Sequence, residues 1–265
     1  TVTGLPFHIN ADFYPSPDRK RIIFGDGFKA EWNELSIQCA TKILSNHCDE
    51  ILEIYSNQDF WEFAERVKKA STKDDLSPEF AQFWELLKPQ IKNKKTVLTS
   101  TNKVVTPIEA IFLDAKELTN AEKIFENLGL NIVHSDLRSR QNLLLEAGVQ
   151  NLKLTDIYNS FINNGFAQRC ELNLMTEGLK SLDGWETLWS VIENLWNRSY
   201  TSDRQQNRSL LKKISIAFGT DGGIWPPEDL FIADQFSQDL FSKVSEVVWY
   251  QSNTNNQSFF NELIP

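Results

Sequence analysis

The chain has 265 residues, a hydrophobic content of 41% and a formal net charge of −9. This size suits one large core or two smaller ones, since domains commonly run to ~100–200 residues. The acidic balance argues against nonspecific binding to nucleic acid and to anionic membranes, because both need a basic face. The sequence has neither a run of roughly 20 apolar residues nor a signal-peptide pattern, so we expect no nucleic-acid and no membrane partner.

The three cysteines, Cys39, Cys48 and Cys170, are odd in number and irregularly spaced. This usage is typical of free thiols in a reducing compartment, so we expect a cytoplasmic protein. The only methionine is Met175. We therefore interpret the chain as a fragment of a longer protein.

The first predicted element is a β-hairpin. Apolar and polar residues alternate over Phe7–Tyr14, which predicts a strand, and Ile22–Phe24 is predicted to be the return strand. Two prolines between them end the first strand, because proline cannot donate to a β-ladder. The predicted tip of the hairpin carries Arg19, Lys20 and Arg21.

A helical region follows. Apolar residues at helical spacing predict one long helix over Glu31–Tyr55 and a second over Asp59–Lys69. Ser77-Pro78-Glu79 is a start signal for a third helix, because it combines a cap, a first-turn proline and an acid at the positive end of the helix dipole. Thr119–Glu122 is a capping box, and Gly129 is predicted to end the helix that the box opens.

The C-terminal half is also predicted to be mainly helical. Short helices are expected at about Ser139–Ala147 and Thr155–Asn163, and the clearest one covers Gly184–Arg198. A last amphipathic helix is expected over Phe236–Trp249, followed by a polar loop over Ser252–Ser258. The tryptophans of the clearest helix lie on one stripe, which favours core packing over a ligand cage.

An internal repeat is visible in two stretches, TVLTSTNKVVTPIEAIFL from Thr96 and SIAFGTDGGIWPPEDLFI from Ser215. An alignment without gaps matches a threonine, a proline, a glutamate and a phenylalanine, the proline pair being Pro107 and Pro226. Each stretch is predicted to form a hairpin followed by a proline-started helical turn.

The predicted fold class is therefore α+β. An N-terminal β-hairpin and a long helix occupy residues 1–57. A mostly helical region over 58–265 carries the two short repeated hairpin units, near 96–113 and 215–232.

The opening stretch TGLPFHINADFYPSPDRKRI, followed by Trp32-Asn33-Glu34-Leu35, resembles the segment of sacsin and its bacterial relatives that follows their ATP-binding domain. That family typically shows a Gly-Leu-Pro-Val-His-Val-Asn-Gly run, an Asp/Asn-Arg-Arg turn and Trp-Asn-Glu-Leu. Leu128–Val133 is similar to a further family segment. The chain departs from the pattern at Ala11, usually glycine, at Pro17, where serine is common, and at Lys20, usually arginine.

The resemblance implies a non-nucleotide-binding middle segment of a chaperone ATPase of the GHKL, heat-shock type. ATP and Mg²⁺ would bind in a domain upstream, with residues 1–57 as its tail or link. In related chaperones a basic side chain from the following domain reaches the ATP γ-phosphate, a role that would fall to Arg19, Lys20 or Arg21. The implied partners are that upstream ATPase domain of the same chain and a client or partner protein, in protein quality control or in defence against phage.

Other interpretations stay open. The charged tip is also typical of a solvated hairpin end that protects a sheet edge from aggregation. The chain as a whole is also compatible with a structural protein-interaction module that has no role in ATP hydrolysis. An independent hydrolase has only scattered polar residues in its favour.

Four further polar sets are His8 with Asn10 and Asp12, Cys39 with His47 and Cys48, His134 with Ser135 and Asp136, and the glycine-rich Gly219–Gly223. The first is typical of the solvent face of a strand. The second fits no usual zinc-finger spacing. The third consists of sequence neighbours, whereas a catalytic triad is assembled in space. The fourth is better explained as a hairpin turn than as a nucleotide loop. We therefore expect no cofactor and no metal within this segment.

Overall fold

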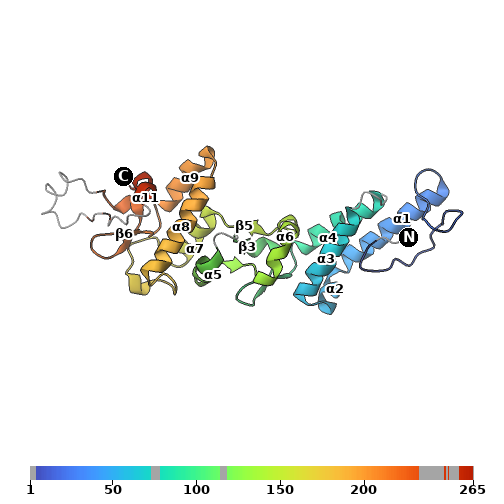
Figure 1. Cartoon of the computed structure of the whole chain (residues 1–265), viewed down its shortest axis with the longest axis horizontal. Coiled ribbons are helices and arrows are strands. Elements are labelled where there is room, and N and C mark those ends of the chain that lie inside the picture. Colours follow the sequence, from blue (N-terminus) through green and yellow to red (C-terminus); the bar gives the residue numbers. More distant parts are fainter. Residues whose placement is uncertain are drawn as a thin grey trace. The chain divides into compact units, whose positions relative to one another are not determined.

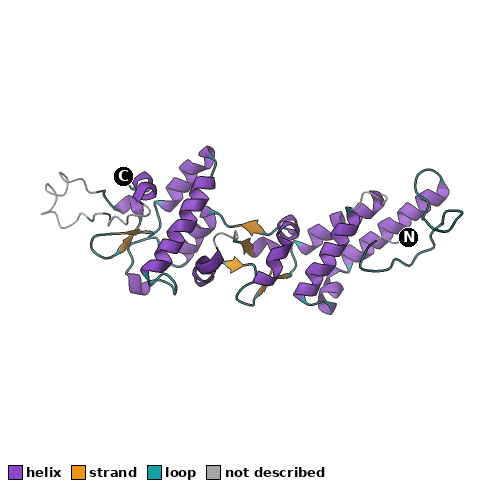
Figure 2. Cartoon of the chain, in the orientation of Figure 1, coloured by secondary structure: helices purple, strands orange, loops and turns teal. Residues whose placement is uncertain are grey.

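The computed structural model describes residues 4–72, 78–113, 118–232, 248, 250 and 257–264 (Figure 1). Helices predominate and the strands are short (Figure 2), which confirms the α+β class. The chain forms two compact units. Unit 1 comprises Thr1–Phe112 and Val133–Gln150, and unit 2 comprises Leu113–Ile132 and Asn151–Pro265. The predicted division at residue 57 therefore does not coincide with a boundary between the two compact units.

Unit 1 is a helical bundle with one hairpin. Its helices are α1 (Phe28–Asn46), α2 (Cys48–Ile54), α3 (Asn57–Ser71), α4 (Gln82–Ile91) and α6 (Gln141–Ala147), and its 3₁₀ turns are η1 (Pro78–Ala81), η2 (Pro107–Glu109) and η3 (Ser135–Arg140). Its strands are β1 (Val97–Leu98), β2 (Val104–Val105) and β3 (Ala110–Phe112). Aromatic side chains of α3, η1 and α4 fill the core, among them Phe60, Trp61, Phe80 and Phe83. The predicted second and third helices are confirmed, although Ser77 lies outside the described residues.

The predicted long helix is divided in two. His47, with φ −100° and ψ 28°, ends α1, and α2 starts at Cys48. Asp49 and Glu50 lie in the first turn of α2, where the positive end of a helix dipole favours negative charge. Cys48 is buried among the helices. A new helix that starts at this point therefore places the two carboxylates at the positive end of its dipole and buries the Cys48 thiol.

The prediction of two strands in an N-terminal β-hairpin is wrong. Residues 7–13 form no strand, and one isolated antiparallel bridge, between Pro15 and Ile22, is what remains of the expected ladder. The reason lies in α1: the side chain of Asn33 binds the backbone of Tyr14 and of Ile23. Ile23 N–H still donates to the carbonyl oxygen of Tyr14 at 3.3 Å, whereas the N–H of Tyr14 and the carbonyl oxygen of Ile23, which would pair with each other in a hairpin, bind Asn33 instead.

Unit 2 has its own helices and hairpin. Its helices are α5 (Leu118–Asn127), α7 (Leu154–Asn163), α8 (Leu182–Arg198), α9 (Thr201–Leu211) and α11 (Gln257–Leu263), with 3₁₀ turns η4 (Leu172–Leu174) and η5 (Pro227–Asp229). Its hairpin strands are β6 (Ala217–Phe218) and β7 (Ile224–Trp225), and β4 (Asn131–Ile132) and β5 (Gln150–Asn151) lie where the chain passes between the units.

Several predictions for unit 2 are confirmed. The helices α7 and α8 have nearly the expected bounds. Gly129, with φ 86°, follows the end of α5 in the left-handed conformation that glycine adopts without strain. The tryptophans of α8 pack in the core: Trp185 and Trp189 are fully buried.

Parts of unit 2 are not as predicted or not described. Helix α9 was not predicted, and Gln257 and Ser258, expected in a loop, begin α11. The predicted helix over Phe236–Trp249 lies outside the described residues except for Val248. The side chain of Thr119, which would open the capping box, also lies outside them.

The two predicted repeat hairpins are present, with a corrected register. β1 pairs with β2 through Val97↔Val105, and β6 pairs with β7 through Ala217↔Trp225. The structure therefore matches Val97 to Ala217, one residue later than the ungapped alignment. The prolines that begin the two 3₁₀ turns are Pro107 and Pro227. Because two prolines are adjacent in the second copy, the sequence alignment selected Pro226, the wrong one.

The structural repeat extends beyond the hairpins. In unit 1 the indole Nε1 of Trp61, on α3, donates to the carbonyl oxygen of Thr96 at 2.8 Å. In unit 2 the indole Nε1 of Trp189, on α8, donates at the same 2.8 Å to the carbonyl oxygen of Ile216, the residue equivalent to Thr96. Each unit thus anchors its hairpin to a helix through one buried tryptophan.

The segments that return to each hairpin also correspond. Val133 pairs with Thr99, and its N–H donates to the carbonyl oxygen of Ile111. Tyr250 pairs with Gly219, and its N–H donates to the carbonyl oxygen of Phe231. Units 1 and 2 are therefore two copies of one structural plan.

We predict that Trp61→Phe and Trp189→Phe each lower the free energy of unfolding by about 1–3 kcal/mol, because each leaves a buried carbonyl without its donor. The two losses should add, since the residues share no partner. Urea unfolding measures both effects. Trp32→Phe is the matched control, because the Trp32 indole bonds to an exposed carbonyl, that of Asp12. An equal loss in all three variants would contradict the buried-anchor role.

Candidate functional site

The three basic residues expected at a hairpin tip lie together on a short braced loop of unit 1. Ser16 N–H donates to the carbonyl oxygen of Arg21 at 2.8 Å, and Arg21 N–H donates to Ser16 Oγ at 3.1 Å. Lys20 N–H donates to Asp18 Oδ1 at 3.1 Å. Arg19 has φ 58°, a left-handed conformation that closes the turn. The Ser16 hydroxyl, which donates to Asp18, is the main cause of a lowered Asp18 pKa.

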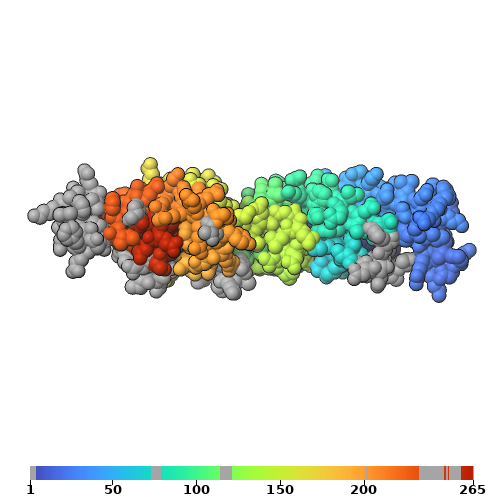
Figure 3. All heavy atoms as spheres, turned by 90° about the horizontal axis from the view of Figure 1, so that it is seen from above, coloured from blue at the N-terminus to red at the C-terminus, as the bar shows by residue number. Residues whose placement is uncertain are grey.

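This tip faces solvent. Arg19, Lys20 and Arg21 are all exposed, and the first residues of the chain, blue in Figure 3, form part of the molecular surface. Within the described part of the chain, neither Arg19 nor Arg21 forms an ion pair with an acidic side chain. Both side chains are open to solvent, and the charge of Arg21 also helps to lower the pKa of Asp18.

Asn33 holds the tip in place. It is fully buried in α1. Its Oδ1 accepts from Tyr14 N–H at 2.8 Å, and its Nδ2 donates to the carbonyl oxygens of Tyr14 and Ile23 at 2.9 and 2.8 Å. These two residues flank the loop that carries the basic tip, so one amide binds both of its ends. Sequence reasoning missed this role, because Asn33 lies off the apolar stripe of Trp32, Leu35, Cys39 and Ile43 and the sequence carries no signal that its face of the helix is buried.

Helix α1 buries Ile37 but turns four of its large apolar side chains outward. Its buried residues are Ala30, Asn33, Ile37, Thr41 and Ser45. Its apolar stripe is instead exposed: Phe28 by 66%, Trp32 by 42%, Leu35 by 55% and Ile43 by 61%. The helical periodicity of the stripe was correctly predicted, but the stripe is not the buried face of the helix.

The exposed stripe lines a shallow, mainly apolar groove. The groove lies between α1 and the opening segment and is lined by Ile9, Ala11, Trp32, Leu35, Cys39 and Ile43. The base of the loop that carries the basic tip lies beside the aromatic end of the stripe, because the Tyr14 ring is 5.9 Å from that of Phe28 and 6.5 Å from that of Trp32. We call the tip residues Arg19, Lys20 and Arg21, together with this groove and Phe28, the N-terminal surface.

The other polar sets do not assemble into a site. His8, Asn10 and Asp12 are exposed. His134 Nδ1 accepts from Asp136 N–H at 3.2 Å, a local cap of η3. Gly219–Gly223 contains the β6–β7 turn, as predicted. Across the described ranges, no three metal-ligating side chains are grouped closely enough to hold an ion.

No family model, curated protein or solved structure matches this chain. The resemblance to the sacsin family therefore rests on the residues quoted above and stays a prediction. None of the helices in the described residues has the length and hydropathy needed to span a bilayer.

We predict that Asn33→Ala lowers the free energy of unfolding by about 2–4 kcal/mol, because it leaves the N–H of Tyr14 and the carbonyl oxygen of Ile23 without their buried partner, while the Tyr14 carbonyl keeps the N–H of Ile23. The amide protons of Tyr14 and its neighbours should then exchange faster with solvent. Hydrogen exchange and urea unfolding measure these effects. Asn10→Ala, at an exposed position of the same groove, should change stability by no more than about 0.5 kcal/mol. Equal effects of the two variants would exclude the clamp.

We predict selective alkylation of the thiols at pH 8. Burial raises the pKa of Cys48 to about 11, so only on the order of 0.1% of this buried thiol is thiolate at that pH. Cys39 is exposed in the groove. Iodoacetamide should therefore modify Cys39 first, and peptide mass spectrometry identifies the modified residue. The rate at Cys48 should still be rising at pH 10. Modification of Cys48 first would contradict its placement in the core.

Proposed function

We propose that this chain is the non-nucleotide-binding middle segment of a sacsin-like, GHKL-type chaperone ATPase, and that it couples ATP binding upstream to a partner or client protein. The observation that carries the proposal is the N-terminal surface. It combines an exposed apolar stripe on α1 with a braced basic tip.

The apolar stripe supports a docking role. Burying a large apolar side chain stabilises a protein by roughly 1.5–3 kcal/mol, yet beside Ile37 the fully buried residues of α1 are small or polar, and Phe28, Trp32, Leu35 and Ile43 are exposed. Contiguous exposed apolar patches mark interaction surfaces. The occupant that we propose is the ATPase domain upstream in the same chain, which the resemblance implies.

The basic tip supports a role in catalysis by that domain. A planar guanidinium binds a phosphate through two parallel hydrogen bonds, and a fixed positive charge stabilises the charge that develops during phosphoryl transfer. The brace through Ser16 and Asp18 holds the backbone of Arg19 and Arg21 before any ligand arrives. Docking of the apolar stripe would bring these groups to ATP and Mg²⁺ held upstream.

A purely structural protein-interaction module is the second candidate. The same apolar stripe favours it, since docking needs no phosphate contact. The two candidates differ only in the role that they give to the basic tip. In either case the duplicated plan of units 1 and 2 supplies a scaffold for a partner or client, and the resemblance favours a role in protein quality control or in defence against phage.

We predict that Arg19→Ala and Arg21→Ala in the full-length protein lower ATP turnover on the order of 100-fold and leave nucleotide affinity unchanged, because the tip would contact phosphate in the transition state. Steady-state kinetics and nucleotide titration measure the two quantities. Arg66→Ala is the matched control, since Arg66 is an exposed arginine of unit 1 on α3. Wild-type turnover in both tip variants would eliminate the coupling role.

Leu35→Asp in the same protein separates the two candidates. A charge in the groove opposes docking in either case, so the partner domain should no longer protect Cys39 from iodoacetamide. Under the coupling proposal this variant also loses ATP turnover. Under the structural alternative it loses protection of Cys39 while turnover stays at the wild-type rate.

A further inference from the structure

We propose that unit 2 has a docking surface for an acidic helix of a partner protein, formed by one side of α9 and the turn that follows it. This surface carries Arg204, Arg208 and Lys212, spaced four residues apart, and Lys213 at its end. We call these four residues the basic row. The N-terminal surface belongs to unit 1 and shares none of them, so the two proposals stand or fall separately.

The basic row is exposed on an acidic protein. Arg204, Arg208 and Lys213 are exposed and Lys212 is half-buried. Residues 201–213 contain these four basic side chains and one acidic side chain, that of Asp203, whereas the whole chain carries −9. Among the residues that the structure describes, no member of the row forms an ion pair with an acidic side chain. The row is therefore a local region of positive potential.

Unit 1 contains a helix that corresponds to α9. Helix α4 ends at Ile91, five residues before Thr96, whose carbonyl oxygen accepts from the anchoring tryptophan of that unit. Helix α9 ends at Leu211, five residues before Ile216, the acceptor of the tryptophan in unit 2. Both terminal residues are fully buried. The two helices therefore hold the same place in the duplicated plan and can be compared residue by residue.

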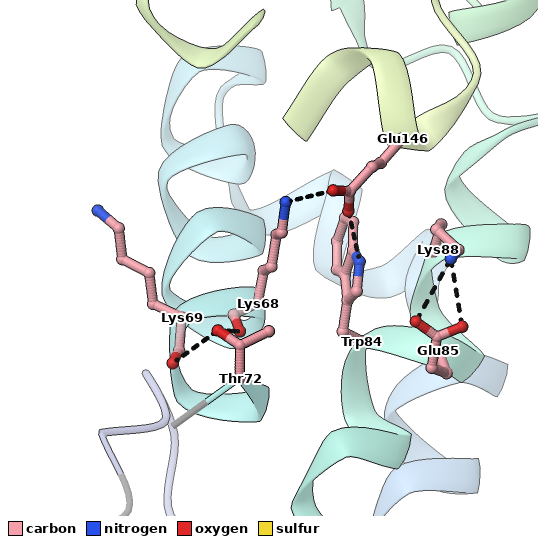
Figure 4. A network of polar contacts seen from close by, with 7 residues as sticks. All are labelled: Lys68, Lys69, Thr72, Trp84, Glu85, Lys88 and Glu146. Atoms are coloured by element: carbon pink, nitrogen blue, oxygen red, sulfur yellow. Dashed lines mark hydrogen bonds and ion pairs between the residues drawn. The ribbon is translucent and has the colours of Figure 1, made fainter. Parts of the chain in front are cut away.

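The two helices differ in how they balance one conserved cation. In α4 the ammonium of Lys88 lies 3.2 Å from the carboxylate of Glu85, three residues earlier (Figure 4). The equivalent residues of α9 are Arg208 and Gln205. The positive charge is thus present in both units, whereas a neutral amide stands in unit 2 where unit 1 has the balancing carboxylate. An acid from another molecule can supply that carboxylate.

A second cation of the row stands where unit 1 has an apolar side chain. Trp84 of α4 is buried and donates through Nε1 to Glu146 at 3.1 Å (Figure 4). The equivalent residue of α9 is Arg204, whose guanidinium lies 6.0 Å from the centre of the Trp196 ring. A cation is attracted to the face of an aromatic ring. This contact orders the guanidinium and leaves its charge unneutralised.

The basic row opposes the stability of its own helix. Like-charged side chains four residues apart destabilise a helix, and Arg208 has such a neighbour on each side, Arg204 and Lys212. Packing at its end holds α9 in place instead: Leu211 is buried, and Glu228 N–H donates to the carbonyl oxygen of Lys212 at 3.2 Å. Local choices that disagree with stability are expected where a surface serves binding.

The spacing and the extent of the row favour an acidic helix as the occupant. A helix rises by 1.5 Å per residue, so cations four residues apart recur about every 6 Å along the axis. Carboxylates four residues apart on a partner helix recur at the same interval and face these cations one by one. A nucleic acid or a membrane would extend over the acidic remainder of the surface, and the attraction of the row is screened within about 8–10 Å.

Fluorescence anisotropy tests the proposal with the 265-residue chain and a labelled alanine-based helical peptide that has a glutamate at every fourth position, at low salt and pH 7.5. The peptide should bind, its glutamine counterpart should not, and added salt should weaken the binding. Gln205→Glu restores the ion pair of unit 1, and Arg208→Gln removes the central cation. Each should weaken binding at least about threefold. Lys88→Gln, at the equivalent position of α4, is the matched control and should change affinity less than about 1.5-fold.

Urea unfolding gives an independent readout. Both α9 variants relieve repulsion within the row, so neither should lower the unfolding midpoint, and their weaker binding then cannot result from loss of the fold. Four outcomes would overturn the proposal. These are no binding of the acidic peptide, equal binding by the wild type and both α9 variants, tighter binding of a single-stranded oligonucleotide or of phosphatidylserine vesicles than of the peptide, and self-association of the chain that Gln205→Glu abolishes.

Discussion

The N-terminal part of unit 1 depends on one buried amide. Asn33 satisfies three backbone groups at the two ends of the opening loop, and the brace between Ser16 and Arg21 completes the turn between them. The amide docks the loop on α1, and the position of the three basic residues follows from that docking.

The same helix explains why the N-terminal surface has its composition. To approach the loop closely, α1 presents Ala30 and Asn33 inward and then Thr41 and Ser45 toward its other end. Ile37 is buried on the same inward face, whereas Phe28, Trp32, Leu35 and Ile43 are exposed, and Trp32 donates to the backbone of Asp12. The orientation of α1 about its own axis therefore determines both features: the close packing on its inward face and the apolar groove on its outer face.

Duplication gives the two units a common frame with different side chains. In unit 1, Thr101 lies in the β1–β2 turn and bonds to Thr99. The equivalent Asp221 of unit 2 binds Arg169 at 2.8 Å and the indole of Trp225 at 3.0 Å. The backbone hydrogen bonds of the frame are the same in both copies, so the turns were able to diverge without loss of the hairpin.

By itself the sequence determined the helices and turns whose signals are local. Helical periodicity and glycine stops placed α3, α7 and α8 within a few residues, and proline and turn residues placed both hairpins. Only the tertiary structure decided which face of α1 is buried, that Asn33 binds Tyr14 and Ile23, and that Glu65 of α3 pairs with Arg140. The physical reason is the distance along the chain over which each signal acts. Periodicity and caps act within one or two helical turns, whereas these features join groups far apart in the chain, and the sequence carries no local record of such contacts.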